Sequence, residues 1–323
     1  MKEMKVQDAV GQILCHDVTR IVRGVVKDAA FRKGHIITAE DIPELLKLGK
    51  ENIFVWEDDE TKLHENDAAE ILRAICQGDN LTATEVKEGK IELKATCDGV
   101  FYVNAQKLNE INAVDEICIA TVNNNIPVRK GKSVVGMRVI PLVIDKLKME
   151  RVTEIAGDVP LMKVVPYQAF KVGLVVTGSE IFHERIEDTF TPVVESKLKS
   201  FGLKIDARRL SDDSKSMTRE KISELLNLGC EMILCTGGMS VDPDDRTPAA
   251  IKSTGADVVT YGVPVLPGAM FMLAYLGDVP IMGLPGCVMF ASKTVFDLIL
   301  PRVLTGEKLT RRDFTTLGVG GLL

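Results

Sequence analysis

The sequence predicts an α/β fold for the second half of the chain: a three-layer, doubly wound, mostly parallel sheet, preceded by a mixed α+β, β-rich N-terminal region. Three observations lead to this prediction. Short apolar runs alternate with segments of helical periodicity over residues 166–305, which is typical of a parallel sheet with helices on both faces. Some of these runs are almost continuously apolar, as strands are when both faces are covered. Glycine-containing corners follow the runs at 177–181, 236–248 and 283–286.

The individual elements of this half follow from periodicity and stop signals. Strands are expected at 170–176, 203–210 and 232–235, and helices at 188–201 and around 222–228, each helix ending at a glycine. Thr247 and Pro248 predict a helix start, with the threonine as N-cap and the proline in the first helical position. Residues 258–282 are expected to be extended, and a long final helix is expected directly after residue 286.

The N-terminal half has a different pattern. We place the main boundary near residue 165, which gives a mixed α+β region at 1–165 and an α/β domain at 166–323. Residues 89–145 are mostly β-like, with turn signals between the strands. A division of the first region into two small subdomains, about 1–65 and 66–165, stays open. A structural or oligomerising role is the default interpretation of the β-rich segment.

Bulk composition excludes several classes of protein. The chain has 323 residues, 46% of them hydrophobic and 27% charged, as globular proteins do. Its net charge of -6 argues against nucleic-acid binding, which needs a basic face. No apolar run resembles a signal peptide or is long enough to span a bilayer. None of the 7 cysteines forms a C-x-x-C pair and the 4 histidines are scattered. We therefore expect a cytoplasmic protein with reduced, mostly buried cysteines and no zinc site.

One corner combines two glycines with downstream carboxylates. Gly237 and Gly238 let the backbone turn sharply and approach a ligand, so that exposed amides can hold a phosphate or a pterin carbonyl. Asp242, Asp244 and Asp245 follow. Because carboxylates repel a phosphate unless a cation lies between them, this pattern predicts a bridging magnesium ion. A glycine turn without a ligand, and an aspartate that only complements a helix dipole, are the structural alternatives.

Two further corners carry groups suited to the same ligand. In the corner at 177–181, Ser179 can donate a hydrogen bond to an anion, and Glu180 can accept from a ligand amine or bind a metal ion. Pro285 and Gly286 form the third corner, although proline–glycine turns are also common without a ligand.

Together these corners resemble the molybdopterin-binding domain of molybdenum-cofactor biosynthesis proteins, over roughly residues 170–305. In molybdopterin molybdotransferases of the MoeA type the motifs are T-G-D-E-L, G-G-V-S-V-G-x-x-D, P-G-K-P and G-L-P-G-N-P. The sequence here reads T-G-S-E-I from 177, G-G-M-S-V-D-P-D-D from 237, P-G-A-M from 267 and G-L-P-G-C-V from 283. Residues 31–49 are similar to a further segment of that family. The departures are Ser179 for its aspartate, Ala269 for its lysine and Cys287 for its asparagine.

The resemblance implies a cytoplasmic, MoeA-like transferase that binds molybdopterin or adenylylated molybdopterin and assists molybdenum insertion. It also implies Mg2+ and molybdate as ligands, and a homo-oligomer, with dimer and trimer both open. Other molybdenum-cofactor biosynthesis proteins and a molybdoenzyme are candidate partners, whereas nucleic acid and membranes are not. The implied catalytic residues are Asp245 and Glu180, and the implied metal ligands are Asp245 and Asp242. The implied ligand-binding residues are Thr177, Gly178, Ser179, Thr236, Gly237, Gly238, Ser240, Thr247, Pro285 and Gly286.

Three alternative functions stay open. The stretch Asp-Arg-Thr-Pro at 245–248 is closer to adenylyltransferases of the MogA type, which favours adenylylation of molybdopterin with ATP. The departures at 179 and 269 favour a non-catalytic carrier or sensor of the molybdenum cofactor. A nucleotide pyrophosphatase of the CinA-like kind is the third alternative, and it leaves the similarity at 31–49 unexplained.

Overall fold

Two compact units make up the protein. The computed structural model describes residues 1–22, 26–55, 59–243 and 245–322. Within these residues no helix is long and apolar enough to cross a membrane. Unit 1 comprises Met1–Cys97, Phe101–Asn124 and Val128–Val164, and unit 2 comprises Asp98–Val100, Asn125–Pro127 and Val165–Leu323. The domains that we propose are residues 1–165 and residues 166–323.

The first part of unit 1 contains two antiparallel strand pairs and one helix. β1 (Lys2–Lys5) pairs with β4 (Asn52–Val55), and β2 (Val18–Val22) pairs with β3 (Val26–Phe31). A 3-10 turn, η1 (Val6–Asp8), follows β1, and α1 (Asp41–Lys47) precedes β4. A small core joins these elements, and it includes Val6, Leu14, Phe31, Leu45 and Ile53.

The rest of unit 1 is built around an antiparallel four-stranded sheet. Its order is β6 (Leu81–Ala83), β7 (Ile91–Ala95), β11 (Ser133–Val139) and β9 (Ile117–Thr121). β5 (Lys62–His64) pairs with β12 (Val143–Asp145), and β8 (Gly99–Val103) lies between β10 (Ile126–Val128) and β13 (Met162–Pro166). The helices are α2 (Glu65–Cys76), α3 (Ala105–Asn112) and α4 (Lys146–Ala156). The segment 89–145 thus contains a helix, α3, besides its strands, and the side chain of Asn104 caps that helix.

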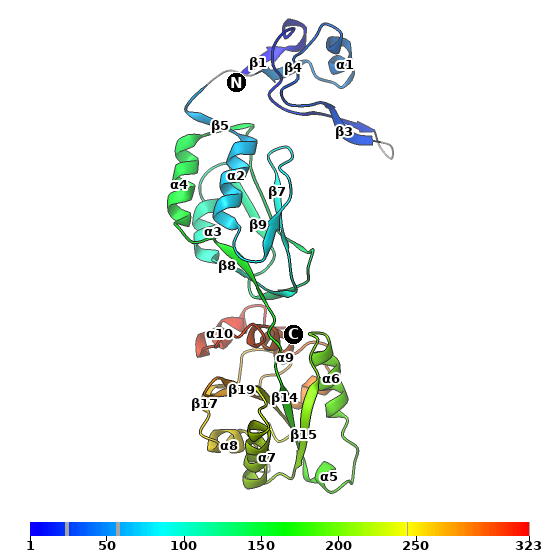
Figure 1. The fold of residues 1–323 in the computed structure, drawn as a ribbon, viewed down its shortest axis with the longest axis vertical. Helices are drawn as coiled ribbons and strands as arrows, with labels where there is room; N and C mark the ends of the chain where they lie inside the picture. Colours follow the sequence, from blue (N-terminus) through cyan, green and yellow to red (C-terminus); the bar gives the residue numbers. More distant parts are fainter. Residues whose placement is uncertain (23–25, 56–58, 244, 323) are drawn as a thin grey trace. The chain divides into compact units, whose positions relative to one another are not determined.

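Unit 2 is built on a six-stranded sheet (Figure 1). The strand order is β15 (Ile205–Ser211), β14 (Val172–Thr177), β16 (Met232–Thr236), β19 (Val279–Leu284), β18 (Met272–Leu276) and β17 (Asp257–Tyr261). The first four strands are parallel, whereas β18 is antiparallel to both of its neighbours. The ends of β14, β16, β19 and β17 and the start of β18 therefore lie at one edge. The predicted α/β class is confirmed for this unit.

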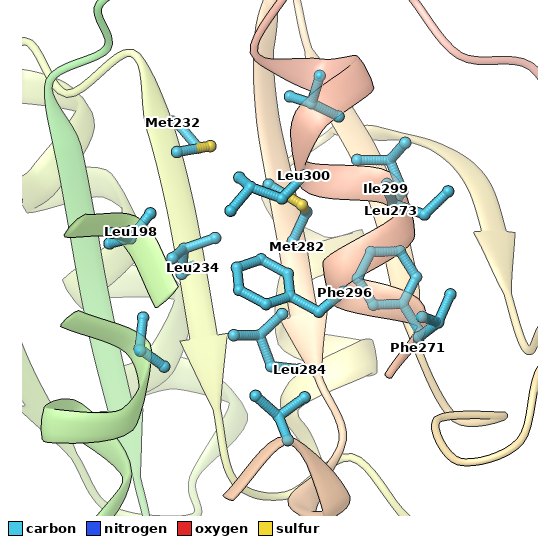
Figure 2. Packing of buried hydrophobic residues seen from close by; sticks show 14 of the residues in the cluster. Leu198, Met232, Leu234, Phe271, Leu273, Met282, Leu284, Phe296, Ile299 and Leu300 are labelled. Carbon is cyan, nitrogen blue, oxygen red and sulfur yellow. The ribbon is translucent and has the colours of Figure 1, made fainter. Parts of the chain in front are cut away.

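Helices cover both faces of this sheet. α6 (Phe190–Lys199) and α9 (Val295–Val303) pack on one face, and α7 (Lys215–Asn227) and α8 (Thr247–Ser253) on the other. Along β14, Leu174 belongs to the first layer and Val175 to the second, because successive strand residues point to opposite faces. Both layers are apolar, which explains the continuous apolar runs of the sequence. Figure 2 shows the first layer, where Leu198 of α6, Leu234 of β16 and Phe296 of α9 contribute to one core.

Two local expectations for unit 2 are wrong. The long helix expected after Gly286 is a 3-10 turn, η2 (Gly286–Met289), and α9 begins after a capping box formed by Thr294 and Asp297. Apolar periodicity does not mark the first residue of a helix, whereas this capping box does. Thr247 is the first residue of α8 rather than its cap, and its hydroxyl donates to the carbonyl of Gly237 at 2.9 Å.

A buried arginine attaches the C-terminal helix α10 (Arg311–Thr315) to α9. Arg302 of α9 is 5% exposed. Its guanidinium contacts the carboxylates of Glu307 and Asp313 at 2.6 Å each. Two carboxylates around one buried cation satisfy its hydrogen-bonding groups, and removing one partner of such a cluster is strongly destabilising.

The 7 cysteines are free thiols. Cys15, Cys76, Cys230 and Cys235 are buried, whereas Cys118 is exposed. Burial raises the pKa of Cys76 and of Cys235 to about 12. These two thiols therefore stay protonated and unreactive at neutral pH.

Candidate functional site

A cavity of about 400 Å³ lies at the edge of the unit 2 sheet where β16 and β19 end. Three chain segments line it: the loop after β16, the loop before β18 and the turn after β19. The segments meet because β18 is antiparallel to β19, so that its first residue, Met272, pairs with Gly283 near the end of β19. The lining residues are Gly237, Gly238, Met239, Ser240, Asp245, Gly268, Ala269, Met270, Pro285, Gly286 and Cys287.

The corner after β16 needs both of its glycines. Gly237 and Gly238 have φ values of 85° and 56°, in the left-handed region that side chains disfavour. A Cβ atom on residue 237 would lie 2.4 Å from the carbonyl oxygen of Thr177. A Cβ atom on residue 238 would lie 2.7 Å from the hydroxyl of Thr247. The loop can therefore turn this closely against β14 and α8 only with glycine at both positions.

Three of the predicted ligand-binding residues are buried threonines that lie behind this corner. Thr177, Thr236 and Thr247 are 4%, 1% and 3% exposed, and none of them lines the cavity. The hydroxyl of Thr177 donates to the carbonyl of Thr236 at 2.9 Å and lies 3.3 Å from the hydroxyl of Thr247. These bonds join the end of β14 to the end of β16 and to α8. The hydroxyl of Thr236 is buried without a hydrogen-bond partner among the described residues.

Backbone amides are among the donors that the cavity offers. The N–H groups of Gly237, Gly238, Met239, Ser240 and Gly286 make no hydrogen bond to another described residue, and all five residues line the cavity. Successive amides in a tight turn form a concave site that attracts anions. Among the described lining residues there is no lysine or arginine. No lining side chain among the described residues would therefore bring a positive charge to an anion bound here, and Asp245 would be a neighbouring negative charge.

Asp245 both closes the loop and is one of the residues that line the cavity. Its amide donates to the carbonyl of Asp242 at 2.9 Å, and its Oδ2 accepts from the amide of Asp242 at 3.3 Å. The side chain of Asp242 is exposed and does not line the cavity, and Asp244 lies outside the described residues. No group of three His, Cys, Asp or Glu side chains suited to a metal occurs in the described part of the chain. One carboxylate fits a magnesium ion shared with ligand phosphates and water, because magnesium is commonly bound in that way.

The corner at the end of β14 does not line the cavity. The amide of Ser179, the first residue of α5 (Ser179–Phe182), donates to the carboxylate of Asp213 at 2.9 Å. A Cβ atom on Gly178 would lie 3.2 Å from the carboxylate of Glu180. None of the residues 177–180 lines the cavity. The structure therefore brings Gly237, Gly238, Ser240, Asp245, Pro285 and Gly286 together and leaves Thr177, Gly178, Ser179, Glu180, Thr236, Asp242 and Thr247 outside the lining.

Sequence reasoning missed two features of the site. Met239 and Met270 line the cavity beside Cys287, so that three sulfur-containing residues belong to its lining. Burial raises the pKa of Cys287, and the charge of Lys197 opposes that change. Tyr261, at the end of β17, hydrogen-bonds to the loop after β16. A single methionine or tyrosine carries no local signal, because only the strand order brings it to this edge.

The comparisons with known proteins place unit 2 in a class of ligand-binding domain. Residues 173–305 match the family described as "Probable molybdopterin binding domain". Residues 3–57 match a second family, which is described only as a domain of unknown function. The four loop motifs predict the same class of domain, a molybdopterin-binding domain.

Relatives of known name extend this result to most of the chain. A molybdopterin molybdenumtransferase from Haemophilus influenzae is 23% identical over 325 residues, covering 94% of this chain and 73% of the relative. One from Staphylococcus epidermidis is 25% identical over 122 residues, covering 36% of this chain and only 29% of the relative's length. The chain is therefore MoeA-like, and the predicted family resemblance is confirmed.

Two solved structures are similar to part of the chain. The molybdopterin biosynthesis enzyme MoaB from Thermus thermophilus has 21% identity and a TM-score of 0.36, covering 43% of this chain and 98% of its own. The protein CinA from Thermoplasma acidophilum has 15% identity and a TM-score of 0.34, covering 36% of this chain and 89% of its own.

Proposed function

We propose that this protein acts in molybdenum-cofactor biosynthesis, binds molybdopterin or its adenylylated form in the cavity of unit 2, and assists molybdenum insertion as a molybdotransferase-like enzyme. The observation that carries this proposal is the cluster of backbone amides, including those of residues 237–240 and Gly286, that line the cavity beside Asp245 and have no hydrogen-bond partner among the described residues. The confirmed resemblance to molybdopterin molybdenumtransferases supplies the ligand class.

In this proposal the phosphate of the pterin binds to the amides of the 237–240 corner and of Gly286. Asp245 would hold a magnesium ion, which would supply the positive charge that the lining side chains lack and would polarise a phosphoryl group. Molybdate enters as a substrate. We keep Asp242 as a proposed outer ligand, because its backbone bonds to Asp245 set the position of that carboxylate.

The corner at 177–180 has a separate proposed role. It lies at the carboxyl end of β14, which is the direct neighbour of β16, so it borders the cavity without lining it. A ligand extended by an adenylyl group needs more room than the pterin, and we propose that it reaches Gly178 and Ser179. Glu180, whose carboxylate lies over Gly178, stays the second proposed catalytic residue.

Direct binding tests the proposal. The purified protein is titrated with molybdopterin and with adenylylated molybdopterin, with and without Mg2+. The variant Asp245→Asn keeps an oxygen that can accept the amide of Asp242 but loses the charge, and we expect it to weaken magnesium-dependent binding by at least about tenfold, or about 1.4 kcal/mol. The matched variant Asp242→Asn alters an exposed carboxylate and should weaken binding less. Unchanged affinity and magnesium dependence in Asp245→Asn would remove Asp245 from the site.

One observation favours a second function, a carrier or sensor of the finished cofactor. Ala269 and Cys287 line the cavity at the positions where the MoeA-type motifs have lysine and asparagine. Incubation of the bound pterin with molybdate and Mg2+ distinguishes the two functions. Molybdenum incorporated into the pterin supports the transferase, whereas tight binding without incorporation supports the carrier. Release of pyrophosphate from ATP would instead indicate adenylylation.

A further inference from the structure

Tyr261, the last residue of β17, lies at the edge of the sheet where the cavity is found and outside every motif of the sequence. Its hydroxyl donates to the carbonyl oxygens of Met239, at 3.1 Å, and Ser240, at 3.3 Å. We propose that Tyr261 is a positioning residue, which orients the peptide groups of residues 239–241 so that their amides face the phosphate of the bound ligand. This inference rests on the proposed function.

The orientation follows from the planarity of the peptide bond. In a trans peptide, the carbonyl of one residue and the N–H of the next point in opposite directions. A hydroxyl that holds the carbonyl of Met239 therefore directs the N–H of Ser240 away from Tyr261. The bond from the same hydroxyl to the carbonyl of Ser240 directs the N–H of Val241 away from Tyr261 as well. Ser240 lines the cavity and its amide has no partner among the described residues, so this N–H is available to a ligand.

The tyrosine hydroxyl restrains a part of the loop that has few other bonds. At one end, the carbonyl of Gly238 accepts from the amide of Thr247 at 3.1 Å. At the other end, the backbone and side-chain bonds between residues 242 and 245 close a turn. Between these ends, within the described residues, the carbonyls of Met239 and Ser240 bond to Tyr261 only. The side chain of Met239 is buried in the core, whereas the next side chain after Ser240, Val241, is 81% exposed. Packing therefore adds little restraint beyond residue 239.

Tyr261 is itself held in place. It pairs with Met272 in the antiparallel ladder of β17 and β18. The ammonium group of Lys252, on α8, lies 5.9 Å from the centre of its ring, within the range of a cation–π contact. Burial, and secondly the charge of Asp245, raise the pKa of Tyr261, so the hydroxyl keeps its proton and remains a donor at neutral pH.

The test compares two tyrosine-to-phenylalanine variants of the full chain. Tyr261→Phe removes the hydroxyl and keeps the ring. Tyr275→Phe is the matched control, because that hydroxyl, on β18 in the same sheet, donates to the carbonyl of Glu307 at 3.4 Å and accepts from the amide of Leu309 at 3.2 Å, and Tyr275 does not line the cavity. Affinities are measured in Mg2+ for molybdopterin and for its dephosphorylated form, and backbone order parameters by NMR.

We expect Tyr261→Phe to weaken binding of molybdopterin about fivefold to tenfold, the loss that one hydrogen bond commonly carries. Binding of the dephosphorylated pterin should not change. The order parameters of Ser240 and Val241 should fall from the rigid range of about 0.85 toward about 0.6, and Tyr275→Phe should alter neither quantity.

Two results would overturn the inference. Unchanged affinity with unchanged order parameters would show that the hydroxyl does not orient the loop. Equal losses for both forms of the pterin would show a general structural role instead of an effect on the phosphate. If the wild-type protein binds neither form, the proposed function itself fails, and the ligand role of Tyr261 fails with it.

Discussion

Thr177 and Thr236 end neighbouring parallel strands, and the same threonine-to-valine change should have opposite effects at the two positions. Both side chains are buried and β-branched, so valine keeps the shape and the side-chain stiffness and removes only the hydroxyl. At Thr236 that hydroxyl has no partner among the described residues. At Thr177 it joins β14 to the carbonyl of Thr236 at 2.9 Å.

The magnitudes follow from these bonds. A buried hydroxyl without a partner costs about 1–3 kcal/mol, so Thr236→Val should raise the free energy of unfolding of unit 2 by about that amount. Its methyl group would lie between Val176 and Leu284, the residues paired with Thr236 in the sheet, where burial adds to the gain. Thr177→Val deletes a buried donor and leaves its acceptor with one bond fewer, which should lower the stability by about 1–3 kcal/mol.

Native-state hydrogen exchange measures both effects in the full chain. Because the protein has two units, a single melting curve does not report on unit 2, whereas exchange of the β14 and β16 amides does. Each 1.4 kcal/mol changes the protection factor about tenfold. We expect protection to rise in Thr236→Val and to fall in Thr177→Val. A fall in Thr236→Val would refute the reasoning, since it would mean that the hydroxyl has a partner such as a buried water molecule.

Three further predictions concern other parts of the structure. Gly237→Ala should destabilise unit 2 by more than Gly255→Ala, because both residues have positive φ values but only residue 237 would place its Cβ atom against backbone. Hydrogen exchange of the β16 amides measures this difference in stability. Equal losses of stability in the two variants would contradict the prediction. Burial by itself raises the pKa of Asp313, but hydrogen bonds from the buried arginine of α9 and from the N-cap of α10 outweigh it, so the pKa is lowered from 3.8. A carboxyl of this kind stabilises the fold above its unfolded pKa and loses that effect as the pH falls through the folded pKa, so protection of α10 should decline between about pH 5 and pH 2. That decline should be reduced in Asp313→Asn and retained in Asp278→Asn, which alters a fully exposed carboxylate. A thiol reagent should modify Cys118, which is exposed, before it modifies the buried cysteines of the native protein. Peptide mapping by mass spectrometry gives the order of modification. Modification of a buried cysteine before Cys118 would contradict the prediction.

The strands and the glycine corners could be predicted because their signals are local. Continuous apolar runs indicate strands with two covered faces, and unit 2 buries β14 and β16 in that way. The pair Gly237 and Gly238 indicates a sharp turn, and both residues have left-handed backbone conformations. The predicted start of α9 is wrong because apolar spacing does not mark the first residue of a helix, whereas the capping box at Thr294 and Asp297 does.

The composition of the candidate site depends on contacts between segments far apart in the sequence. Thr177 and Thr247 lie in loop motifs, yet their hydroxyls donate to the backbone carbonyls of Thr236 and Gly237. Ser179 precedes a helical turn, and its amide is taken by Asp213 from the next loop. A motif indicates that a residue is near a ligand-binding edge, but it does not indicate which way the side chain or the amide points.

The α/β class of the second half, the turns after its strands and the family resemblance can be predicted from the sequence, since each depends on residues close together in the chain. Which corners share a cavity, and which residues support it, depends on the folded arrangement of the strands. Met270 and Tyr261 reach that edge because β17 and β18 extend the parallel sheet with two antiparallel pairings. Strand order and direction are set by burial of the whole sheet between two helical layers, and no local run of residues encodes them.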